Sequence, residues 1–556
     1  MDTQTPVLII GGGPTGLTAS LLLSHLVIPH VLIEKRSGPI AAPAAHVINR
    51  RTLEIFRQCG LPMAEIYALD EHREQRSVVR WSSDLAGPAV AQLDVSELAE
   101  DSAALSRERL ANISQYRLEA LLLEQARQHD TATVLHGHEW LGFADDRLQR
   151  SQVRLPDGST TTIGSTYVLA ADGAGSGVRS TLSIEQAGPS NLATFLALSV
   201  RARAPEGVLL NWCLDPKYSG VTITHHPSEL TVYMRQLYEP WETPADFDDA
   251  VCQQLVDDLF EGQTTEVLRK DVWRMTAQVA ERFRSGPVFL IGDAAHRFPP
   301  TGGLGLNSGV ADAHNLVWKI AAHLNGAADE LLDTYELERK PVVQRNCDES
   351  LRNFRKMDEV IRAIGLDPEQ ASVPARVLAS APLRLLPRPF RSSLFKLITL
   401  PVRRLLRRCT TSTTKQAAVQ AAADDQRGHF DMPQLELGYV YGPGVATGNG
   451  CAPAAMPGAR LPHVAITDKT DSSLHDLLCY QGYTLLSTGA TPDEPAETFG
   501  LPLKRIDLSS LGALDETINE TIDGTIDKPI TRALALAPED WILVRPDGHV
   551  AARKQH

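Results

Sequence analysis

Cysteine is scarce in this chain of 556 residues, which carries only seven cysteines. They are scattered, without a C-x-x-C pair or regular spacing, so no disulfide framework is predicted. An odd number of unpatterned cysteines is typical of free thiols in a reducing compartment. The histidines likewise avoid H-E-x-x-H and comparable spacings. We therefore expect no metal site and no nucleophilic triad.

A basic excess and long apolar runs are also missing. The net charge of −14 argues against general affinity for nucleic acid. No uninterrupted apolar run is long enough to span a bilayer, and no basic, then hydrophobic leader precedes the first strand-like segment at Val7. We expect a cytoplasmic protein without a signal peptide, without a nucleic-acid partner and without stable membrane insertion. The length allows about three or four globular domains.

A glycine-rich turn stands near the start of the chain. "VLIIGGGPTG" (7–16) places a buried strand before three glycines in G-x-G-x-x-G order, with a proline where a helix would begin. An apolar helix-like stretch and a second strand, "HVLIEK", follow. This order predicts a dinucleotide site, with pyrophosphate on the helix N-terminus and ribose on the acid that ends the second strand. The predicted contacts are Gly11, Gly13, Pro14, Thr15, Gly16, Glu34 and Lys35.

Beyond this unit the pattern of expected strands and helices changes several times along the chain. Residues 1 to about 180 alternate strands and helices, whereas short strand-like runs between about 190 and 275 predict an inserted antiparallel sheet. "PVFLIGDAAH" then returns to a buried-strand pattern. A helix is expected from about 305 to 324, and helical segments continue to about 420. From about 430 a small α/β unit is expected, closed by a hairpin that turns at Asp547 and Gly548.

Two further motifs each place an acid after a buried strand. "YVLAADGAGSGVRS" (167–180) delivers Asp172, and "VFLIGDAAHRFPPTGGLGLNSG" (288–309) delivers Asp293 before a Pro/Gly loop and a helix. Small residues at that helix start would let a flat ring system approach, and the positive helix end would stabilise negative charge on the ring. Alone, each motif is an ordinary strand-to-helix turn.

Together, in this order, the three motifs resemble the single-component FAD-dependent aromatic hydroxylases. These are the class A flavoprotein monooxygenases with the p-hydroxybenzoate hydroxylase fold, and the similarity is to phenol, dichlorophenol and polyketide hydroxylases. "AHVINRRTLEIFRQCGL" (45–61) and "ISQYRLEALLLEQA" (113–126) resemble further family segments. "MPGARLPH" and "VRPDGHVA" are similar to the thioredoxin-like C-terminal domain of larger members, here without C-x-x-C because Cys451 and Cys479 are isolated.

The resemblance implies an α/β fold with three domains. A discontinuous Rossmann-like FAD-binding domain would span 1–185 and 276–420, with a helical extension at about 325–420. An inserted antiparallel-sheet substrate domain would span 186–275, and a thioredoxin-like domain without disulfide chemistry would span 430–556.

The resemblance also assigns cofactor contacts. Arg51 is similar to an arginine that reaches the FAD phosphates, and Gln115 to a glutamine near the ribityl chain. Asp172 resembles a residue that links FAD binding with NAD(P)H use, and Asp293 resembles the acid that holds a ribityl hydroxyl. The remaining expected contacts are Gly292, Pro300, Gly303, Leu306 and Asn307. Leu304 stands where the family often has glutamine, which we interpret as subgroup variation.

The family implies a specific chemistry. NADPH or NADH would reduce non-covalent FAD, and the reduced flavin would react with O2 to give a C4a-hydroperoxide that hydroxylates a phenolic or polycyclic aromatic compound, such as a secondary metabolite. Alternatives are epoxidation, Baeyer–Villiger oxidation or oxidative dearomatisation on the same cofactor, or a flavoprotein that does not oxygenate. A homodimer is a candidate assembly.

A phenol substrate would benefit from a base that removes its proton. Candidates on the inserted sheet are Tyr233, Arg235 and His225, of which the first two share a strand face that could meet solvent. His296, His46 and His314 are favoured as structural residues, although His46 could lie near the flavin.

One stretch combines basic and apolar residues: "FRSSLFKLITLPVRRLLRRC" (390–409). It would either lie on an anionic membrane surface or form a helix pair that covers the FAD domain with its arginines in solvent. Pro401 interrupts a continuous amphipathic helix and favours the second interpretation.

Overall fold

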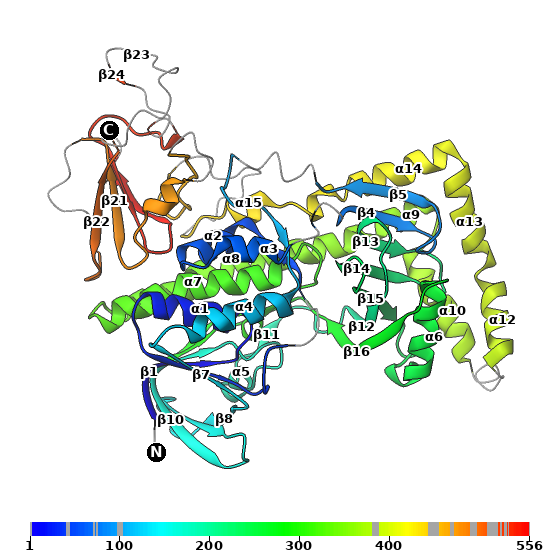
Figure 1. Cartoon of the computed structure of the whole chain (residues 1–556), viewed down its shortest axis with the longest axis horizontal. Coiled ribbons are helices and arrows are strands. Elements are labelled where there is room, and N and C mark those ends of the chain that lie inside the picture. The colour runs from blue at the N-terminus through cyan, green and yellow to red at the C-terminus, as the bar shows by residue number, and fades with distance from the viewer. Residues whose placement is uncertain are drawn as a thin grey trace.

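Two large β-sheets and a smaller C-terminal sheet frame the molecule (Figure 1). The computed structural model describes residues 3–40, 45–70, 73, 76–96, 104–380, 388–442, 455–466, 472–489, 498–508, 521–522, 525–526, 531 and 533–554, and structural statements refer to these. Cys451 lies outside the described residues. The six described cysteines are free thiols.

The first sheet is built around buried parallel strands. Its order is β18-β19-β10-β1-β2-β7, and β1 pairs in parallel with both β10 and β2. The apolar run Val7–Ile10 is buried, as a parallel strand covered on both faces requires. The strands are β1 (Thr3–Ile10), β2 (His30–Glu34), β7 (Ala132–His136), β8 (Glu139–Phe143), β9 (Arg150–Arg154), β10 (Thr160–Ala170), β18 (Arg284–Ser285) and β19 (Val288–Leu290).

Long helices cover this sheet. α1 packs against both α7 and α4, and α8 packs along α7. The helices of this unit are α1 (Pro14–His25), α2 (Arg50–Gln58), α3 (Met63–Ala68), α4 (Gln115–Arg127), α5 (Gly177–Thr181), α7 (Leu304–Leu324) and α8 (Glu330–Lys356). Short ladders pair β3 (Val47–Ile48) with β6 (Ala111–Asn112), and β17 (Gln278–Ala280) with β11 (Gln186–Ala187) and β20 (His296–Arg297).

The second sheet is mostly antiparallel and wider than the sequence predicts. Its order is β16-β12-β15-β14-β13-β4-β5, and β4 joins in parallel beside β13. The expected limits 186–275 are therefore too narrow, because two strands from the 76–94 region complete the sheet. The strands are β4 (Arg76–Ser82), β5 (Ala89–Asp94), β12 (Ala193–Arg201), β13 (Gly207–Cys213), β14 (Gly220–His226), β15 (Leu230–Leu237) and β16 (Glu266–Met275), with helix α6 (Asp249–Leu259) packed beside β16.

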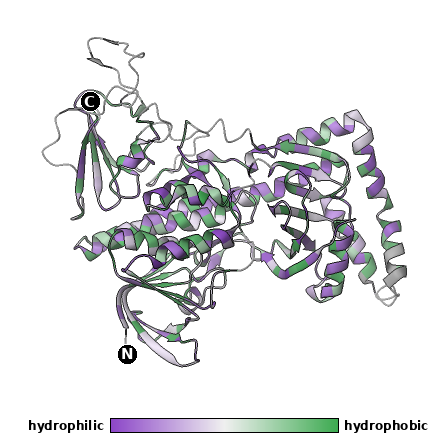
Figure 2. Cartoon of the chain, in the orientation of Figure 1, coloured by the Kyte–Doolittle hydropathy of each residue, from purple (hydrophilic) through white to green (hydrophobic). Residues whose placement is uncertain are grey.

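A helical arm follows α8 and packs on the second sheet. α14 contacts β5 and α9, and a shared apolar core joins Trp81 and Leu93 to Val419 and Ala423. The expected extension of the FAD domain to about 420 is thus corrected, because the arm covers the other sheet. Its helices alternate hydrophilic and hydrophobic residues (Figure 2). They are α9 (Asp358–Ile364), α10 (Val373–Ala379), α12 (Arg388–Ile398), α13 (Leu400–Thr411) and α14 (Thr413–Asp424).

The basic and apolar stretch 390–409 lies in this arm. The Arg403 guanidinium pairs with Asp215 at 2.9 Å, whereas Phe390 and Leu397 are exposed. Within the described part of the chain, no helix has the length and hydropathy needed to cross a membrane.

The C-terminal unit carries a four-stranded sheet of order β22-β21-β25-β26. β21 and β22 are parallel, whereas β25 and β26 form an antiparallel hairpin that turns at Asp547 and Gly548, where the sequence predicts it. The elements are α15 (Pro433–Glu436), β21 (Tyr483–Ser487), β22 (Leu503–Asp507), β23 (Thr521–Ile522), β24 (Thr525–Ile526), β25 (Trp541–Val544) and β26 (Val550–Lys554). The thioredoxin-like assignment stays a prediction.

Candidate active site

One large cavity connects the first sheet with the second. Its volume is about 1350 Å³, which exceeds the roughly 300–1,000 Å³ of pockets that hold one small ligand. At one end it reaches the glycine-rich turn and the carboxyl ends of β1, β2 and β10, and at the other it reaches the inner face of the second sheet. This cavity has room for a dinucleotide and a second molecule together.

The glycines of the first turn have separate roles. Gly11 has φ +110°, and a Cβ there would lie 2.2 Å from the Ala171 carbonyl oxygen. A Cβ on Gly16 would lie 2.0 Å from the Gly11 carbonyl oxygen, so this glycine lets helix α1 pack closely on the strand. A Cβ on Gly13 would meet nothing within 4 Å. Gly13 therefore leaves the start of α1 open to the cavity.

Glu34 closes the turn from the end of β2. Its side chain accepts hydrogen bonds from the Gly12 N–H at 2.7 Å and from the Arg36 N–H and Nε at 2.9 and 2.8 Å. Burial favours the neutral acid, but these hydrogen bonds outweigh it and lower the pKa of Glu34. The group is therefore an ionised acceptor beside the cavity. His138 and Trp140 line the same end.

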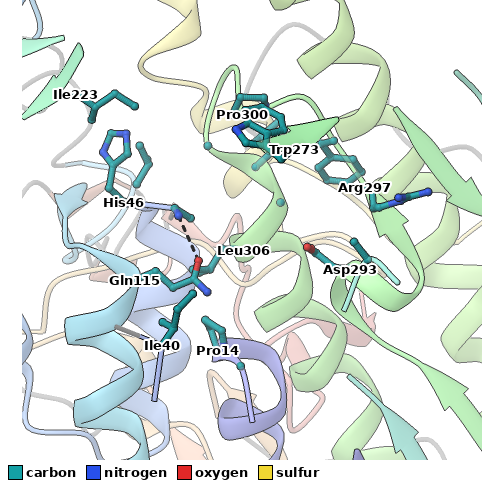
Figure 3. A pocket seen from close by; sticks show the side chains of 18 of the residues that line it. Pro14, Ile40, His46, Gln115, Ile223, Trp273, Asp293, Arg297, Pro300 and Leu306 are labelled. Atoms are coloured by element: carbon teal, nitrogen blue, oxygen red, sulfur yellow. Dashed lines mark hydrogen bonds between the residues drawn. The ribbon is translucent and has the colours of Figure 1, made fainter. Parts of the chain in front are cut away.

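Two further carboxylates face the middle of the cavity. Oδ2 of Asp172 accepts from the Val178 N–H at 3.1 Å, whereas its Oδ1 is buried without a hydrogen-bond partner among the described residues. Asp293 points into the cavity (Figure 3). Its side chain is exposed to that space, but protein surrounds the space on most sides, so desolvation raises the pKa of Asp293. Both arrangements suit a ligand that donates hydroxyl hydrogen bonds.

The far wall is the Pro/Gly loop and the start of α7. Gly303 caps the helix with φ +64°, where a Cβ would lie 2.6 Å from Val47 Cβ. Gln115 faces this region from the start of α4, and its Oε1 accepts the Ala45 N–H at 3.2 Å (Figure 3). The predicted cofactor contacts that line the cavity are Gly11, Gly13, Pro14, Thr15, Glu34, Lys35, Gln115, Asp172, Asp293, Pro300, Gly303 and Leu306.

Four predicted contacts do not line the cavity: Gly16 and Gly292, which act through packing, and Arg51 and Asn307, whose side chains bind elsewhere. Arg51 donates to the Asp547 carbonyl oxygen at 2.7 Å and pairs with Glu54 at 3.1 Å, so its guanidinium holds the C-terminal unit rather than a phosphate. Asn307 is buried behind the loop, where its Oδ1 accepts from the Asn49 N–H and the Thr52 hydroxyl. We correct both expectations, because neither side chain lines the cavity.

Gly292, another predicted contact, also acts through packing. A Cβ there would lie 2.6 Å from the Thr15 hydroxyl, and the residue has φ +60°. The absence of a side chain brings the turn after β19 against helix α1. Gly292 therefore shapes the site without lining it.

The second sheet contributes an apolar and aromatic wall. Three tryptophans of this sheet line the cavity: Trp81, Trp212 and Trp273. Trp273 stacks on Phe195 with centroids 4.9 Å apart and planes 15° apart. Aliphatic lining residues between the tryptophans are Ala197, Leu210, Val221, Ile223, Val232 and Met234. Such a wall favours a flat apolar ligand.

Two of the three candidate bases point away from this wall. Tyr233 is buried on the α6 side of β15, and its hydroxyl donates to the Tyr218 carbonyl oxygen at 2.9 Å. Arg235 lies on the same face and pairs with Glu242 at 2.7 Å. Their neighbours Val232 and Met234 line the cavity instead. Both candidates are therefore corrected, because successive side chains of a strand face opposite sides.

The third candidate, His225, does line the cavity. Its Nδ1 is 2.6 Å from the Ser114 hydroxyl. Burial is the main reason that the pKa of His225 lies well below its ordinary value, and the neighbouring His46 and Arg76 lower it further. Its Nε2 is buried without a hydrogen-bond partner among the described residues, and the role of His225 as a base stays a prediction.

The histidines that the sequence favours as structural differ in their surroundings. His296 is fully buried 2.7 Å from Asp312, and His314 is 2.9 Å from Gln58 and stacks on Tyr480. His46 lines the cavity, as does His429 from the segment before α15. In the described ranges, no group of three or more His, Cys, Asp or Glu side chains is placed to hold a metal ion.

Sequence reasoning missed several lining residues. Trp81 comes from β4, where "RSVVRWS" is a usable strand signal, but nothing local shows that this strand joins β13. Trp140 lies beyond the motifs on β8. Gln426, His429 and Phe430 follow the helical arm and reach the cavity only through the tertiary fold.

Comparison with known proteins gives two family matches. A model described as FAD binding domain matches residues 4–350, and one described as aromatic-ring hydroxylase, C-terminal, matches residues 454–556. The tetracenomycin A2 monooxygenase-dioxygenase of Streptomyces glaucescens is 32% identical over 372 residues, which are 61% of this chain. The match spans 66% of that relative's length, just under two-thirds.

Two further comparisons extend over nearly the whole chain. The phenol 2-monooxygenase of Pseudomonas sp. (strain EST1001) is 26% identical over 597 residues, which cover 99% of this chain and 90% of the relative. The crystal structure of the flavin-dependent monooxygenase PieE, in complex with FAD and substrate, has a TM-score of 0.78 and 26% identity. It covers 100% of this chain and 96% of that one.

Proposed function

Because the chain belongs to the FAD-binding family of class A aromatic-ring monooxygenases, we propose that it hydroxylates a phenolic or polycyclic aromatic compound with FAD, NAD(P)H and O2. One observation carries the proposal. A single cavity joins a dinucleotide-binding turn to an aromatic wall, with the carboxylates of Asp172 and Asp293 between them. Likeness to phenol and polyketide oxygenases supports the substrate class.

The residues at the first-sheet end fit FAD. Open space at Gly13, the ionised acceptor of Glu34 and the unpartnered Asp172 Oδ1 match what a dinucleotide needs: access for a pyrophosphate and acceptors for hydroxyl groups. Glu34 would hold the adenosine ribose, and Asp293 would hold a ribityl hydroxyl. When bound, FAD supplies a ring that a nicotinamide nucleotide can reduce and that can then activate oxygen.

The chain's own contribution is orientation and exclusion of water. The wall that includes Trp81, Trp212 and Trp273 would hold a flat ring system by apolar and stacking contacts. The start of α7 at Leu304 presents a positive helix end toward the same space, which favours negative charge there. Enclosure of the ring limits the entry of water, which would otherwise waste reducing equivalents as hydrogen peroxide.

A substrate panel tests the proposal. The purified protein should be yellow or bind added FAD, and candidate phenols should stimulate oxidation of NADPH or NADH. Under ¹⁸O2, mass spectrometry should show a product heavier by one labelled oxygen. A product with oxygen inserted beside a carbonyl, or as an epoxide, would point to the alternative outcomes on the same cofactor. A protein that neither contains nor binds flavin would contradict the proposal.

A matched pair of variants locates the cofactor. Asp293→Asn removes the carboxylate that faces the cavity and should weaken FAD binding about tenfold or more, because a charge-assisted hydrogen bond contributes about 1.5–3 kcal/mol. Asp333→Asn, on the exposed side of α8, is the control and should leave FAD affinity unchanged. Quenching of flavin fluorescence measures both affinities. Equal FAD affinities of the two variants would show that Asp293 does not contribute to FAD binding.

A further inference from the structure

The helical arm concentrates positive charge on one part of an acidic chain. Between Gln370 and Ala423 the sequence has ten lysines and arginines but no aspartate or glutamate, although the net charge of the whole chain is −14. Within this segment, α12 and α13 form an outer edge of the molecule, beyond α10 and the second sheet (Figure 1). This charge distribution favours contact with a negatively charged surface.

The helical hydrogen bonds continue past Pro401, from α12 into α13. Pro401 stands in the first turn of α13, where a helix needs no N–H donor. The Thr399 N–H donates to the Phe395 carbonyl oxygen at 3.0 Å, and the Arg403 N–H donates to the Thr399 carbonyl oxygen at 3.2 Å. Residues that are three or four positions apart across this junction therefore lie on the same side.

One side of this helix pair carries a row of exposed side chains, which we call the arm stripe. From Leu397 onwards its members recur at intervals of three or four residues, and Phe390 precedes Leu397 by two turns, a spacing that keeps them on one side. The exposed fractions of Phe390 and Leu397 are both 66%. The arm stripe consists of Phe390, Leu397, Leu400, Arg404, Arg407 and Arg408, all exposed.

The opposite side of α13 packs on the protein. Leu406 and Cys409 are buried in the core that the arm shares with β4, β5 and α14. The Arg403 guanidinium pairs with Asp215 at 2.9 Å. The arm is therefore anchored without the arm stripe, and the apolar and basic side chains of the stripe stay available to a partner.

We propose that the arm stripe binds the surface of a membrane that contains anionic phospholipids. Phe390 and the two leucines enter the boundary between headgroups and acyl chains, while the three arginines contact lipid phosphates. Apolar groups beside clustered arginines are typical of helices that lie in this boundary. A partner with a groove encloses most of a helix, but here one side is already packed. The remaining strip, about 27 Å long, can meet a plane of headgroups along its whole length.

Sedimentation of the full-length protein with vesicles tests the proposal, independently of any flavin chemistry. The vesicles contain phosphatidylcholine alone or phosphatidylcholine with about one-third phosphatidylglycerol, and the salt concentration is about 50 mM or about 300 mM. We expect sedimentation with the anionic vesicles and little with the neutral ones. Binding should weaken several-fold at the higher salt concentration, because screening shortens the range of the charges.

Two sets of substitutions separate the charge from the apolar contact. Arg404→Gln, Arg407→Gln and Arg408→Gln together should weaken binding to the anionic vesicles about a hundredfold, since each arginine near such a surface contributes about fivefold. Phe390→Ser together with Leu397→Ser should weaken the binding about tenfold or more, because the apolar area that enters the membrane is lost.

Matched controls lie on other exposed surfaces. Arg154→Gln, Arg201→Gln and Arg352→Gln together change the net charge by the same amount at three exposed positions outside the arm stripe. Leu337→Ser removes a leucine of α8 that is 70% exposed. Both controls should keep the wild-type binding to anionic vesicles.

Several results would overturn the proposal. One is a wild-type protein that does not sediment with anionic vesicles at the lower salt concentration. Another is an apolar variant that binds these vesicles as tightly as wild type, since the arm would then serve any polyanion. Controls that lose as much binding as the stripe variants would also count against it. Light scattering tests self-association: a wild-type dimer that becomes monomeric in the triple arginine variant, without vesicle binding, would assign the stripe to a second copy of the chain.

Discussion

Adjacent residues on one strand have unrelated roles in this protein. Val232 and Met234 line the cavity, whereas Tyr233 and Arg235 are buried against α6 on the other face of β15. The residues with the more reactive side chains are thus the ones that cannot meet a ligand. The residue type suggests what a side chain could do, but the face of the strand on which it lies decides whether it can contact a ligand.

The first glycine turn gives a matched pair of substitutions. Gly11→Ala would place a Cβ 2.2 Å from a backbone oxygen at φ +110°, and we expect a loss of at least about 2 kcal/mol in the free energy of unfolding. Gly13→Ala, with φ −79° and open space around the Cβ, should change that free energy by less than about 0.5 kcal/mol but weaken FAD binding. Urea unfolding and flavin titration measure the two effects. Equal losses of stability in Gly11→Ala and Gly13→Ala would contradict the different roles of the two glycines.

Glu436 gives a pH dependence with a defined sign. The Glu436 carboxyl is buried against the Arg50 guanidinium, which also pairs with Asp431. Burial is the main reason that the pKa of Glu436 rises to about 7. The Asp431 charge adds to the shift and Arg50 opposes it. The folded state therefore holds a proton that the unfolded state releases near pH 4.5. The stability that this proton provides is complete below that value and is lost as the pH rises to about 7.

The measurement compares wild type with Glu436→Gln, which cannot titrate. The free energy of unfolding of wild type minus that of the variant should fall by on the order of 3 kcal/mol between pH 4 and pH 8. The comparison cancels the other titrating groups. A difference that stays constant with pH, or rises, would show that Glu436 is ionised in the folded protein throughout.

At the scale of elements, the helical arm gains its stability from the sheet it covers. The stretch 390–409 is basic and amphipathic enough to suggest a surface helix, and Phe390 and Leu397 are indeed exposed. Cys409 and Leu406, however, are buried in the core shared with β4, β5 and α14. Part of the arm therefore packs on the same face of the sheet as Trp81 and Trp212, which line the cavity.

Val419→Asp tests this packing. Val419 is fully buried in the shared core, and an unpaired carboxylate there should cost about 3 kcal/mol or more of stability. Ala418→Asp places the same group on the neighbouring, exposed position of α14 and should cost less than about 1 kcal/mol. Urea unfolding gives the free energies, and limited proteolysis should cut the arm faster in the first variant only. Similar behaviour of both would mean that the arm is not anchored on β5.

At the scale of the whole molecule, buried charges join the C-terminal unit to the rest of the chain. Arg545 at the end of β25 pairs with Glu338 of α8 at 2.6 Å and with Asp547 of its own turn. Arg51 of α2 meets the same turn. Apolar residues of β21 and β25 pack on Trp318 of α7. The C-terminal unit thus packs against α7, whose first residues line the cavity.

Arg545→Met tests how much this ion-pair network contributes to the free energy of unfolding. It leaves Glu338 and Asp547 buried with one fewer cation, although Lys319 still pairs with Glu338 at 2.7 Å. We expect a loss of about 3–5 kcal/mol, the usual effect of breaking a buried pair. Arg201→Met, which breaks an exposed pair with Glu266, should cost less than about 1 kcal/mol. Calorimetric unfolding compares them, and equal effects would contradict a bracing role.

The sequence predicts the residues that line the first-sheet end of the cavity far better than those that line the second-sheet end. Gly11, Asp172 and Asp293 each follow a buried strand and Glu34 ends one, and the carboxyl ends of parallel strands meet at one edge of a sheet. Local order therefore places them together. Arg51 and Asn307 belong to the same segments but turn away, because their partners lie on elements remote in sequence.

What the sequence by itself determined is the strand–turn–helix chemistry of the dinucleotide site, because the conformational demands of glycine, proline and a terminal acid act within a few residues. Only the tertiary structure decided the aromatic wall of the cavity. β4 joins β13 across a long stretch of chain, and the choice of which face of β15 meets the cavity depends on α6 covering the other. Such choices are made by packing between distant segments, and no local pattern of residues encodes them.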